Sequence, residues 1–182
     1  MAGVSEQAPI AALQGGSSAQ IQKLMADFAA TLARSGLRVG GVVESGEAAP
    51  GGACGKLSLR DLSTGEQFAI SQNLGPGSQA CNLDGRGLTS ACGAVERALA
   101  GGLDFVILSK FGKLEATRGG LYDAFQIAAA SRTPLLTAVS PAMAAAWDAF
   151  AGPLSQFLPV EIEAVESWAR RWLAESHAVA AE

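Results

Sequence analysis

The chain has 182 residues, of which 49% are hydrophobic and 16% charged, with a formal net charge of -4 and a pI near 5.0. This length fits one ordinary domain, and the composition excludes intrinsic disorder, which requires low hydrophobicity and high net charge. The acidic balance argues against a dedicated nucleic-acid-binding protein, and no apolar run approaches the roughly 18 residues of a membrane span. We therefore expect neither a nucleic-acid partner nor a membrane segment.

Cysteine and histidine usage narrows the chemistry further. The start of the chain lacks a basic region and carries Glu6 early, so we expect no secretory signal and a cytoplasmic protein. An odd number of cysteines does not suggest a disulfide framework. The single histidine, His177, lies close to the C-terminus, which excludes a Ser-His-Asp or Cys-His catalytic site and a clustered zinc site. We predict no metal site.

The first predicted elements are a strand, a helix and a second strand. A short apolar run at residues 9–13 ends at the pair Gly15-Gly16. Apolar residues then recur at helical spacing from Ile21 to Leu32, and Gly36 can cap this helix. Residues 37–43 predict the next strand.

The middle of the chain predicts a loop, a hairpin and a second helix. Residues 44–55 are rich in glycine and favour a loop. Two alternating runs flank Ser63-Thr64-Gly65 and predict a β-hairpin. A glycine-rich loop at 73–87 follows, and Leu88 to Leu99 then form an amphipathic helix that ends at two glycines.

The last third predicts strands at 103–108 and 134–139, a helix at 121–130 between them, a short helix opened by Pro141, and a final helix from Ile162. Strands joined by helices predict an α/β fold with three layers, a mostly parallel sheet flanked by helices, and the hairpin as an addition. We expect one domain at residues 9–175, with flexible ends at 1–8 and 176–182.

Three loops are candidate sites, because ligands of open parallel sheets gather at the carboxyl ends of strands. The first, between the first strand and the first helix, carries Gly15, Gly16, Ser17 and Ser18. Glycines let backbone N–H groups turn toward an anion, and a helix N-terminus offers free donors and a favourable dipole. A tight turn with a serine cap explains these residues equally well.

The first loop departs from the nucleotide-binding motif G-x-x-x-x-G-K-[ST]. Counting from Gly15, the second glycine is replaced by Gln20, the lysine by Ile21 and the hydroxyl by Gln22. Counting from Gly16 restores none of the three. The loop is thus a degenerate form of the motif, without the phosphate-binding lysine and the magnesium-binding hydroxyl.

The second loop, residues 109–120, places Lys110, Lys113 and Arg118 after a buried strand, with Glu115 between them. Three cations suit an anionic ligand better than a metal. Glu115 could orient water or pair with Arg118. Each cation taken singly is explained by a solvated loop, but their shared place at a strand's carboxyl end favours a site.

The third loop contains Cys81, which lies near Arg86 and shortly before a predicted helix. Such a setting can activate a thiol, so Cys81 is a candidate redox or ligand contact. Without a histidine partner, ordinary packing explains it as well. Cys92 falls on the apolar stripe of the following helix and is predicted to lie in the core.

Residues 9–172 resemble an uncharacterised bacterial family, a domain of unknown function, which is distantly similar to the small P-loop nucleoside-triphosphatases first described from thermophiles. The most specific part is FGKLE at 111–115 followed by RGGL at 118–121. The resemblance implies a P-loop-NTPase-like fold. In those enzymes the strand matching 103–108 ends in two acids; here Ser109 and Lys110 replace them, which implies little hydrolysis.

Three functions follow. The leading hypothesis is a domain that binds an anion, a nucleotide or an oxyanion, with little or no hydrolysis; the resemblance adds a link to molybdate handling. The second is a nucleoside-triphosphatase with an altered active site. The third is an interaction protein that uses Trp147, Trp168 and Trp172 as anchors, and a homodimer stays open. Any cofactor is left unassigned.

Overall fold

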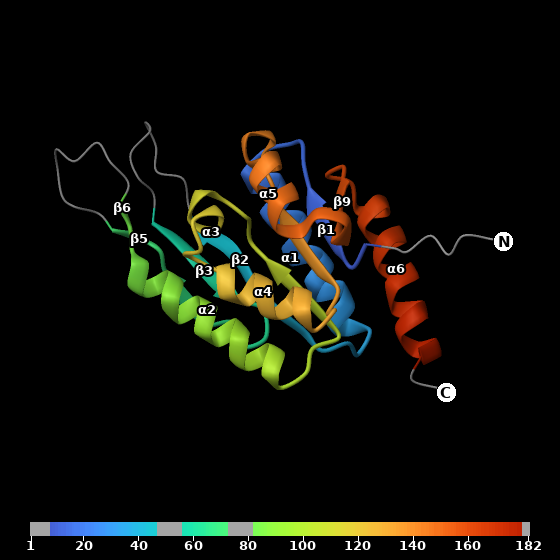
Figure 1. The fold of residues 1–182 in the computed structure, drawn as a ribbon. Coiled ribbons are helices and arrows are strands. Elements are labelled where there is room, and N and C mark those ends of the chain that lie inside the picture. Colours follow the sequence, from blue (N-terminus) through green and yellow to red (C-terminus); the bar gives the residue numbers. More distant parts are fainter. Residues whose placement is uncertain (1–7, 47–55, 73–81, 180–182) are drawn as a thin grey trace.

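The computed structural model describes residues 8–46, 56–72 and 82–179 (Figure 1). They contain a seven-stranded sheet with the order β4-β3-β2-β7-β8-β1-β9. Five neighbouring strands run parallel: β2 (Val39–Gly46), β7 (Phe105–Leu108), β8 (Leu135–Ala138), β1 (Ile10–Leu13) and β9 (Ser155–Leu158). The hairpin β3 (Leu57–Asp61) and β4 (Gln67–Ala69) extends the sheet antiparallel to β2, and β5 (Ser71–Gln72) pairs with β6 (Asn82–Leu83) separately. The predicted mostly parallel sheet with an added hairpin is confirmed.

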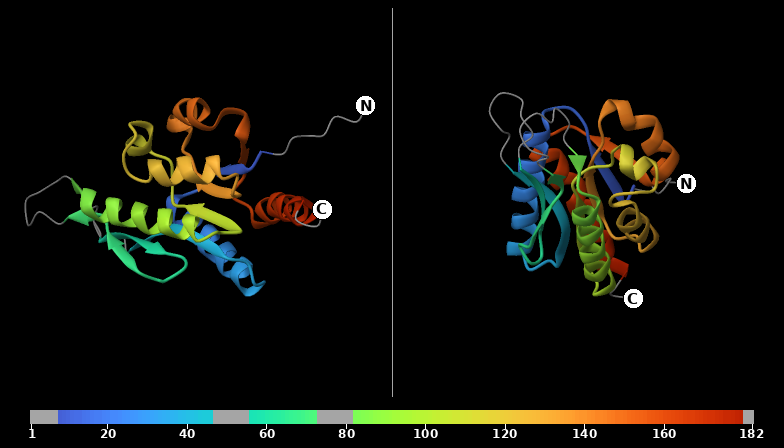
Figure 2. Two further views of the ribbon diagram at one scale, coloured as in Figure 1. Left: turned by 60° about the horizontal axis from the view of Figure 1, so that its bottom comes forward. Right: turned by 90° about the vertical axis from the view of Figure 1, so that its left-hand side faces the viewer.

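Helices cover both faces of the sheet (Figures 1 and 2). On one face lie α1 (Ser18–Arg34) and α6 (Ile162–Val179); on the other lie α2 (Gly85–Ala100), α4 (Tyr122–Ala130) and α5 (Ala144–Ala151). In β1, Ala11 and Leu13 face the first pair of helices, whereas Ile10 and Ala12 face the other three. Strands buried on both faces read as unbroken apolar runs, which is why they were recognisable. The predicted three layers are confirmed.

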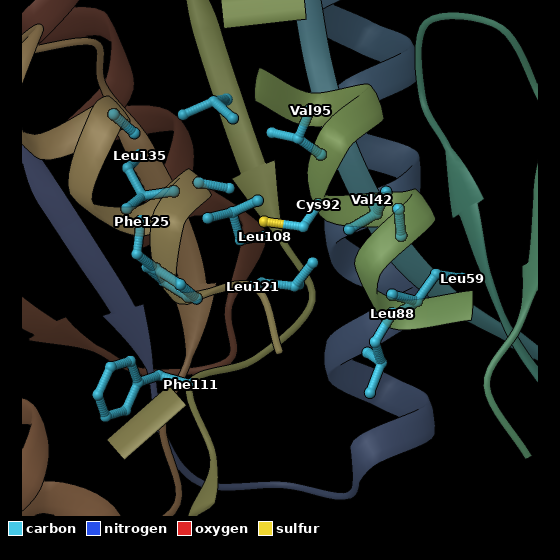
Figure 3. Close-up of a cluster of buried hydrophobic side chains, with 14 of the residues drawn as sticks. Val42, Leu59, Leu88, Cys92, Val95, Leu108, Phe111, Leu121, Phe125 and Leu135 are labelled. Atoms are coloured by element: carbon cyan, nitrogen blue, oxygen red, sulfur yellow. The ribbon is translucent and has the colours of Figure 1, made fainter. Parts of the chain in front are cut away.

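The core facing α2, α4 and α5 packs against one face of the sheet (Figure 3). Phe111 lies there, with ring centroids 5.5 Å from Phe125 and 5.1 Å from Trp147. Trp147 and Trp168 are fully buried and Trp172 nearly so, so the three tryptophans fill the two cores rather than an exposed patch.

Several boundaries differ from those expected. Strand β2 continues through Gly46, where a loop was predicted, because its last residues pair with β3. Strand β9 was missed, since Ser155 and Gln156 break its apolar pattern. The short helix α3 (Lys113–Ala116) and 3₁₀ turns at 141–143 and 152–154 complete the described elements, and among these residues no helix is long and apolar enough to cross a bilayer.

The residue that precedes Pro9 is anchored to helix α6. The carbonyl of Ala8 accepts hydrogen bonds from the indole N–H groups of Trp168 and Trp172, at 3.1 and 2.8 Å. Helix α6 runs to Val179, beyond the residue 175 at which we expected the domain to end.

Candidate functional site

The first two candidate loops meet in one pocket of about 450 Å³ at the carboxyl ends of the parallel strands. Gly15, Gly16 and Ser18 line it from the first loop, and Lys110 and Gly112 line it from the second. The remaining lining residues are Gln14, Ile21, Gln22, Phe111, Ala138, Val139, Ser140, Pro141 and Met143. The strand order explains the meeting, because β8 alone separates β1 from β7.

The Gly15-Gly16 turn has a conformation that only glycine adopts easily. Both residues have positive φ angles, 92° and 94°. Gln14 anchors the turn from one side, donating its backbone N–H to Leu158 and its side-chain amide to Val139. The turn therefore exposes backbone at the start of α1, and a second hollow of about 750 Å³ lies on its other side, toward residues 159–162.

Ser17 and Ser18 have different surroundings. Ser17 caps α1: its hydroxyl accepts from the Gln20 backbone N–H, and its own N–H donates to the Gln20 side chain. This capping box engages the Ser17 hydroxyl and the Ser17 backbone N–H, the two groups of this residue that we expected to bind a ligand. Ser18 lies on the pocket, and its hydroxyl is 3.4 Å from a carboxylate oxygen of Glu44.

Lys110 is held over the pocket by its two neighbours in the chain. Ser109 is buried, and its carbonyl accepts from the side chain of Gln22 at 2.8 Å. Phe111 is anchored in the aromatic core and donates its backbone N–H to Ala138. With these neighbours fixed inward, the Lys110 side chain projects outward and is about half exposed.

Two residues in or beside the pocket were not predicted from the sequence as part of a site. The Glu44 side chain is only 9% exposed and forms an ion pair with Lys110, with Nζ 2.5 Å from Oε1. Gln22 is buried and links β2 to β7, since its Oε1 accepts from the Glu44 backbone N–H and its Nε2 donates to Ser109. Gln22 stands where the motif has its hydroxyl, which was a signal; Glu44 gave none, because it fell in a predicted loop.

Glu115 lies in a different setting from Lys110. Its side chain is buried, and its two carboxylate oxygens accept backbone N–H groups from Gly112 at 2.9 Å and Leu121 at 3.0 Å. The first bond caps α3 and the second fixes the start of α4. These bonds give Glu115 a clear structural task in shaping the connection.

The structure separates the three cations that the sequence grouped. Arg118 has a positive φ of 63° after α3 and lines another pocket, of about 310 Å³, together with Cys92, Glu96 and Asp123. Lys113 is exposed at the start of α3 and is not among the residues that line the Lys110 pocket. Of these three cations, Lys110 is thus the one that lines a pocket together with the Gly15-Gly16 turn.

The two cysteine predictions fare differently. Cys81 and most of the third loop lie outside the described residues. Cys92 is buried beside Leu108, as predicted for a core residue (Figure 3). Burial raises the pKa of the Cys92 thiol to about 11 from its ordinary 9.0, and the Glu96 carboxylate adds to the shift.

A family model described as "Protein of unknown function (DUF2478)" matches residues 10–168. The chain belongs to this family. The match includes every residue that lines the Lys110 pocket. It confirms the resemblance seen in the sequence and adds no activity to it.

Two further comparisons show known proteins to which the DUF2478 chain is similar. The molybdenum import ATP-binding protein ModC 2 of Bradyrhizobium diazoefficiens is 39% identical over 150 residues, which are 82% of this chain and 17% of that protein. The chain thus spans about a sixth of the length of this relative.

The crystal structure of THEP1 from the hyperthermophile Aquifex aeolicus matches the DUF2478 fold with a TM-score of 0.58. The match covers 89% of this chain and 94% of that one, at 12% sequence identity. At such identity the likeness concerns the fold alone. The predicted likeness to a P-loop nucleoside-triphosphatase fold is confirmed.

Proposed function

We propose that this chain is a P-loop-like domain that binds a small anionic ligand, a nucleotide or an oxyanion, with little or no hydrolysis. One observation carries the proposal: the Gly15-Gly16 turn, the start of α1 and Lys110 line the same pocket. Backbone donors at a helix start and one ammonium group are complementary to an anion. Molybdate is a candidate oxyanion, supported by the likeness to a protein named for molybdenum import.

The degenerate loop supports weak hydrolysis. Helix α1 starts at Ser18, and the side chain at the motif's hydroxyl position, Gln22, is engaged with Glu44 and Ser109 rather than free to hold magnesium. Glu115, our candidate catalytic carboxylate, has both oxygens engaged by backbone N–H groups.

Isothermal titration of the purified chain with ATP, GTP, orthophosphate and molybdate tests the proposal. We expect binding of at least one, weakened about tenfold or more by Lys110→Gln, because a hydrogen bond to a charged group contributes roughly 1.5–3 kcal/mol. Lys113→Gln is the matched control, since it removes the same charge from the same connection outside the pocket. Absence of binding to all four ligands at millimolar concentration would reject the proposal.

One observation favours the nucleoside-triphosphatase alternative. Glu44 places an unanticipated carboxylate beside the pocket, where it could orient an attacking water. Magnesium-dependent phosphate release from ATP above background would favour this function over simple binding. The interaction-protein alternative has lost the tryptophans on which it rested, because all three are buried.

A further inference from the structure

The charge balance of the Lys110 pocket is unusual for an anion site. Among its lining residues in the described part of the chain, Lys110 alone carries a formal charge. That charge is already paired with the carboxylate of Glu44, at 2.5 Å. A ligand entering the pocket therefore meets a neutral ion pair and the start of α1, not a free cation.

Glu44 cannot easily give up its partner. Its Oε1 atom has no measurable solvent contact, and only 9% of the side chain is exposed. The Ser18 hydroxyl lies 3.4 Å from Oε2, a long distance for a hydrogen bond. The Glu44 carboxylate is largely withdrawn from solvent although Lys110 is about half exposed, so losing Lys110 would leave a poorly hydrated charge without its partner, which is unfavourable. This cost favours Lys110 staying beside Glu44 when an anion arrives.

The backbone fixes this arrangement from two sides. The Glu44 N–H donates to Gln22 at 2.8 Å, and the same Gln22 side chain holds Ser109, the residue before Lys110. The pair consequently joins two neighbouring strands, β2 and β7, where Gln22 holds the backbone of both. The carboxylate therefore lies beside the pocket, next to the lining residues Ser18 and Lys110, and is not a freely moving surface group.

We propose that Glu44 is a specificity-determining residue that limits the charge of the ligand. The proposal rests on the proposed anion-binding function and names the ligand class more closely: a compact oxyanion of low charge. Each added negative charge on a ligand gains attraction from Lys110 but meets repulsion from Glu44 a few ångströms away. Polyphosphates, which concentrate several charges, therefore gain no affinity from the pair over a single compact oxyanion.

Titration calorimetry with a charge series tests this inference. Orthophosphate, pyrophosphate and tripolyphosphate serve as probes, in EDTA so that no divalent cation bridges Glu44 and the ligand. We expect the wild-type affinity to stay within about threefold along the series. In Glu44→Gln, the affinity should rise about tenfold for orthophosphate and more for each longer probe, because Lys110 is then free.

Two controls separate charge from fold. Glu66→Gln removes an equal charge from the exposed turn of the β3–β4 hairpin and should leave all three affinities unchanged. In the double variant Glu44→Gln/Lys110→Gln the gain should disappear. A thermal melt checks the fold of each variant; the Gln22 bond to residue 44 uses the backbone and survives the substitution.

The outcomes are distinct. Equal affinities of wild type and a folded Glu44→Gln would overturn the inference while leaving the anion site in place. A wild-type affinity that rises more than tenfold from orthophosphate to tripolyphosphate would also overturn it, whether or not the variant folds. No binding of any probe by either protein would instead remove the proposed function itself.

Discussion

The connection between β7 and α4 contains two regions that differ in the surroundings of their charged side chains. Its first residues, 109–112, open onto the pocket: Lys110 is half exposed and stands beside the glycine turn. Its later residues, 113–121, close on themselves, with Glu115 buried and both carboxylate oxygens satisfied. The Lys110 ammonium group of the first region lines the pocket, whereas the Glu115 carboxylate of the second region binds backbone N–H groups. Nearness in sequence therefore did not mean convergence on one site.

This difference has a physical origin in the short helix α3. Phe111 pairs with the end of β8 and ties the first region to the sheet. After it, one helical turn and the left-handed Arg118 redirect the chain toward α4, so Arg118 lines a separate pocket over α2. Glu115 sits inside this bend and binds both of its ends. The comparison can be tested by removing the groups that define each region.

The largest expected effect is on the closed region. Glu115→Ala leaves the N–H groups of Gly112 and Leu121 without their acceptor, so we expect a loss of about 2–4 kcal/mol in the free energy of unfolding. Urea denaturation measures it, and Asp148→Ala, an exposed carboxylate on α5, should change stability little. Ligand affinity of the folded variant should be retained. A variant of normal stability that fails to bind would instead make Glu115 a site residue.

A smaller effect is expected where the two regions meet the rest of the site. Gln22→Met keeps the side chain's length but removes its bonds to Glu44 and Ser109, which should cost about 1–3 kcal/mol. Here ligand affinity should change as well, because Gln22 lines the pocket and positions both members of the ion pair. Gln126→Met on the exposed side of α4 is the matched control. Unchanged affinity in Gln22→Met would remove Gln22 from the site.

Much of the fold could be predicted from the sequence, because strands buried on both faces and amphipathic helices leave strong local patterns. The glycine turn and Lys110 were predicted for the same reason: each directly follows a recognisable strand. Glu44 was missed because its strand is completed by pairing with β3, a tertiary effect absent from the local pattern. Strand β9 was missed likewise, since it pairs with β1 across a long sequence separation.

The grouping of charges could not be predicted. Lys110, Lys113 and Arg118 look equivalent in the sequence, and only the inward anchoring of Ser109 and Phe111 selects Lys110. The role of Glu115 was equally hidden, since a carboxylate between cations suggests ion pairs, whereas in the fold its partners are backbone N–H groups. Side-chain direction, set by the tertiary path of the chain, decided both.

The smallest predicted effect concerns Cys92, which lines the pocket of about 310 Å³ together with Arg118. Its folded-state pKa of about 11 lies above the ordinary 9.0, so the folded chain keeps the thiol proton after the unfolded chain has lost it. This contribution to stability is complete below about pH 9 and is lost as the pH rises toward about 11. We expect a decline of about 1–2 kcal/mol across that window beyond the decline seen in Cys92→Ala.

Urea denaturation in reducing buffer at several alkaline pH values measures this difference. Cys92→Ala supplies the reference because it retains the other groups that titrate there, including the lysines and Tyr122. If the Arg118 guanidinium governed the thiol, it would lower the thiol pKa, and the wild type would gain stability relative to Cys92→Ala as the pH rose toward 9. The sign of the stability difference between wild type and Cys92→Ala therefore reports whether burial or Arg118 controls the thiol pKa. The buried sulfur and the nearby Glu96 carboxylate both raise that pKa, so we expect a decline.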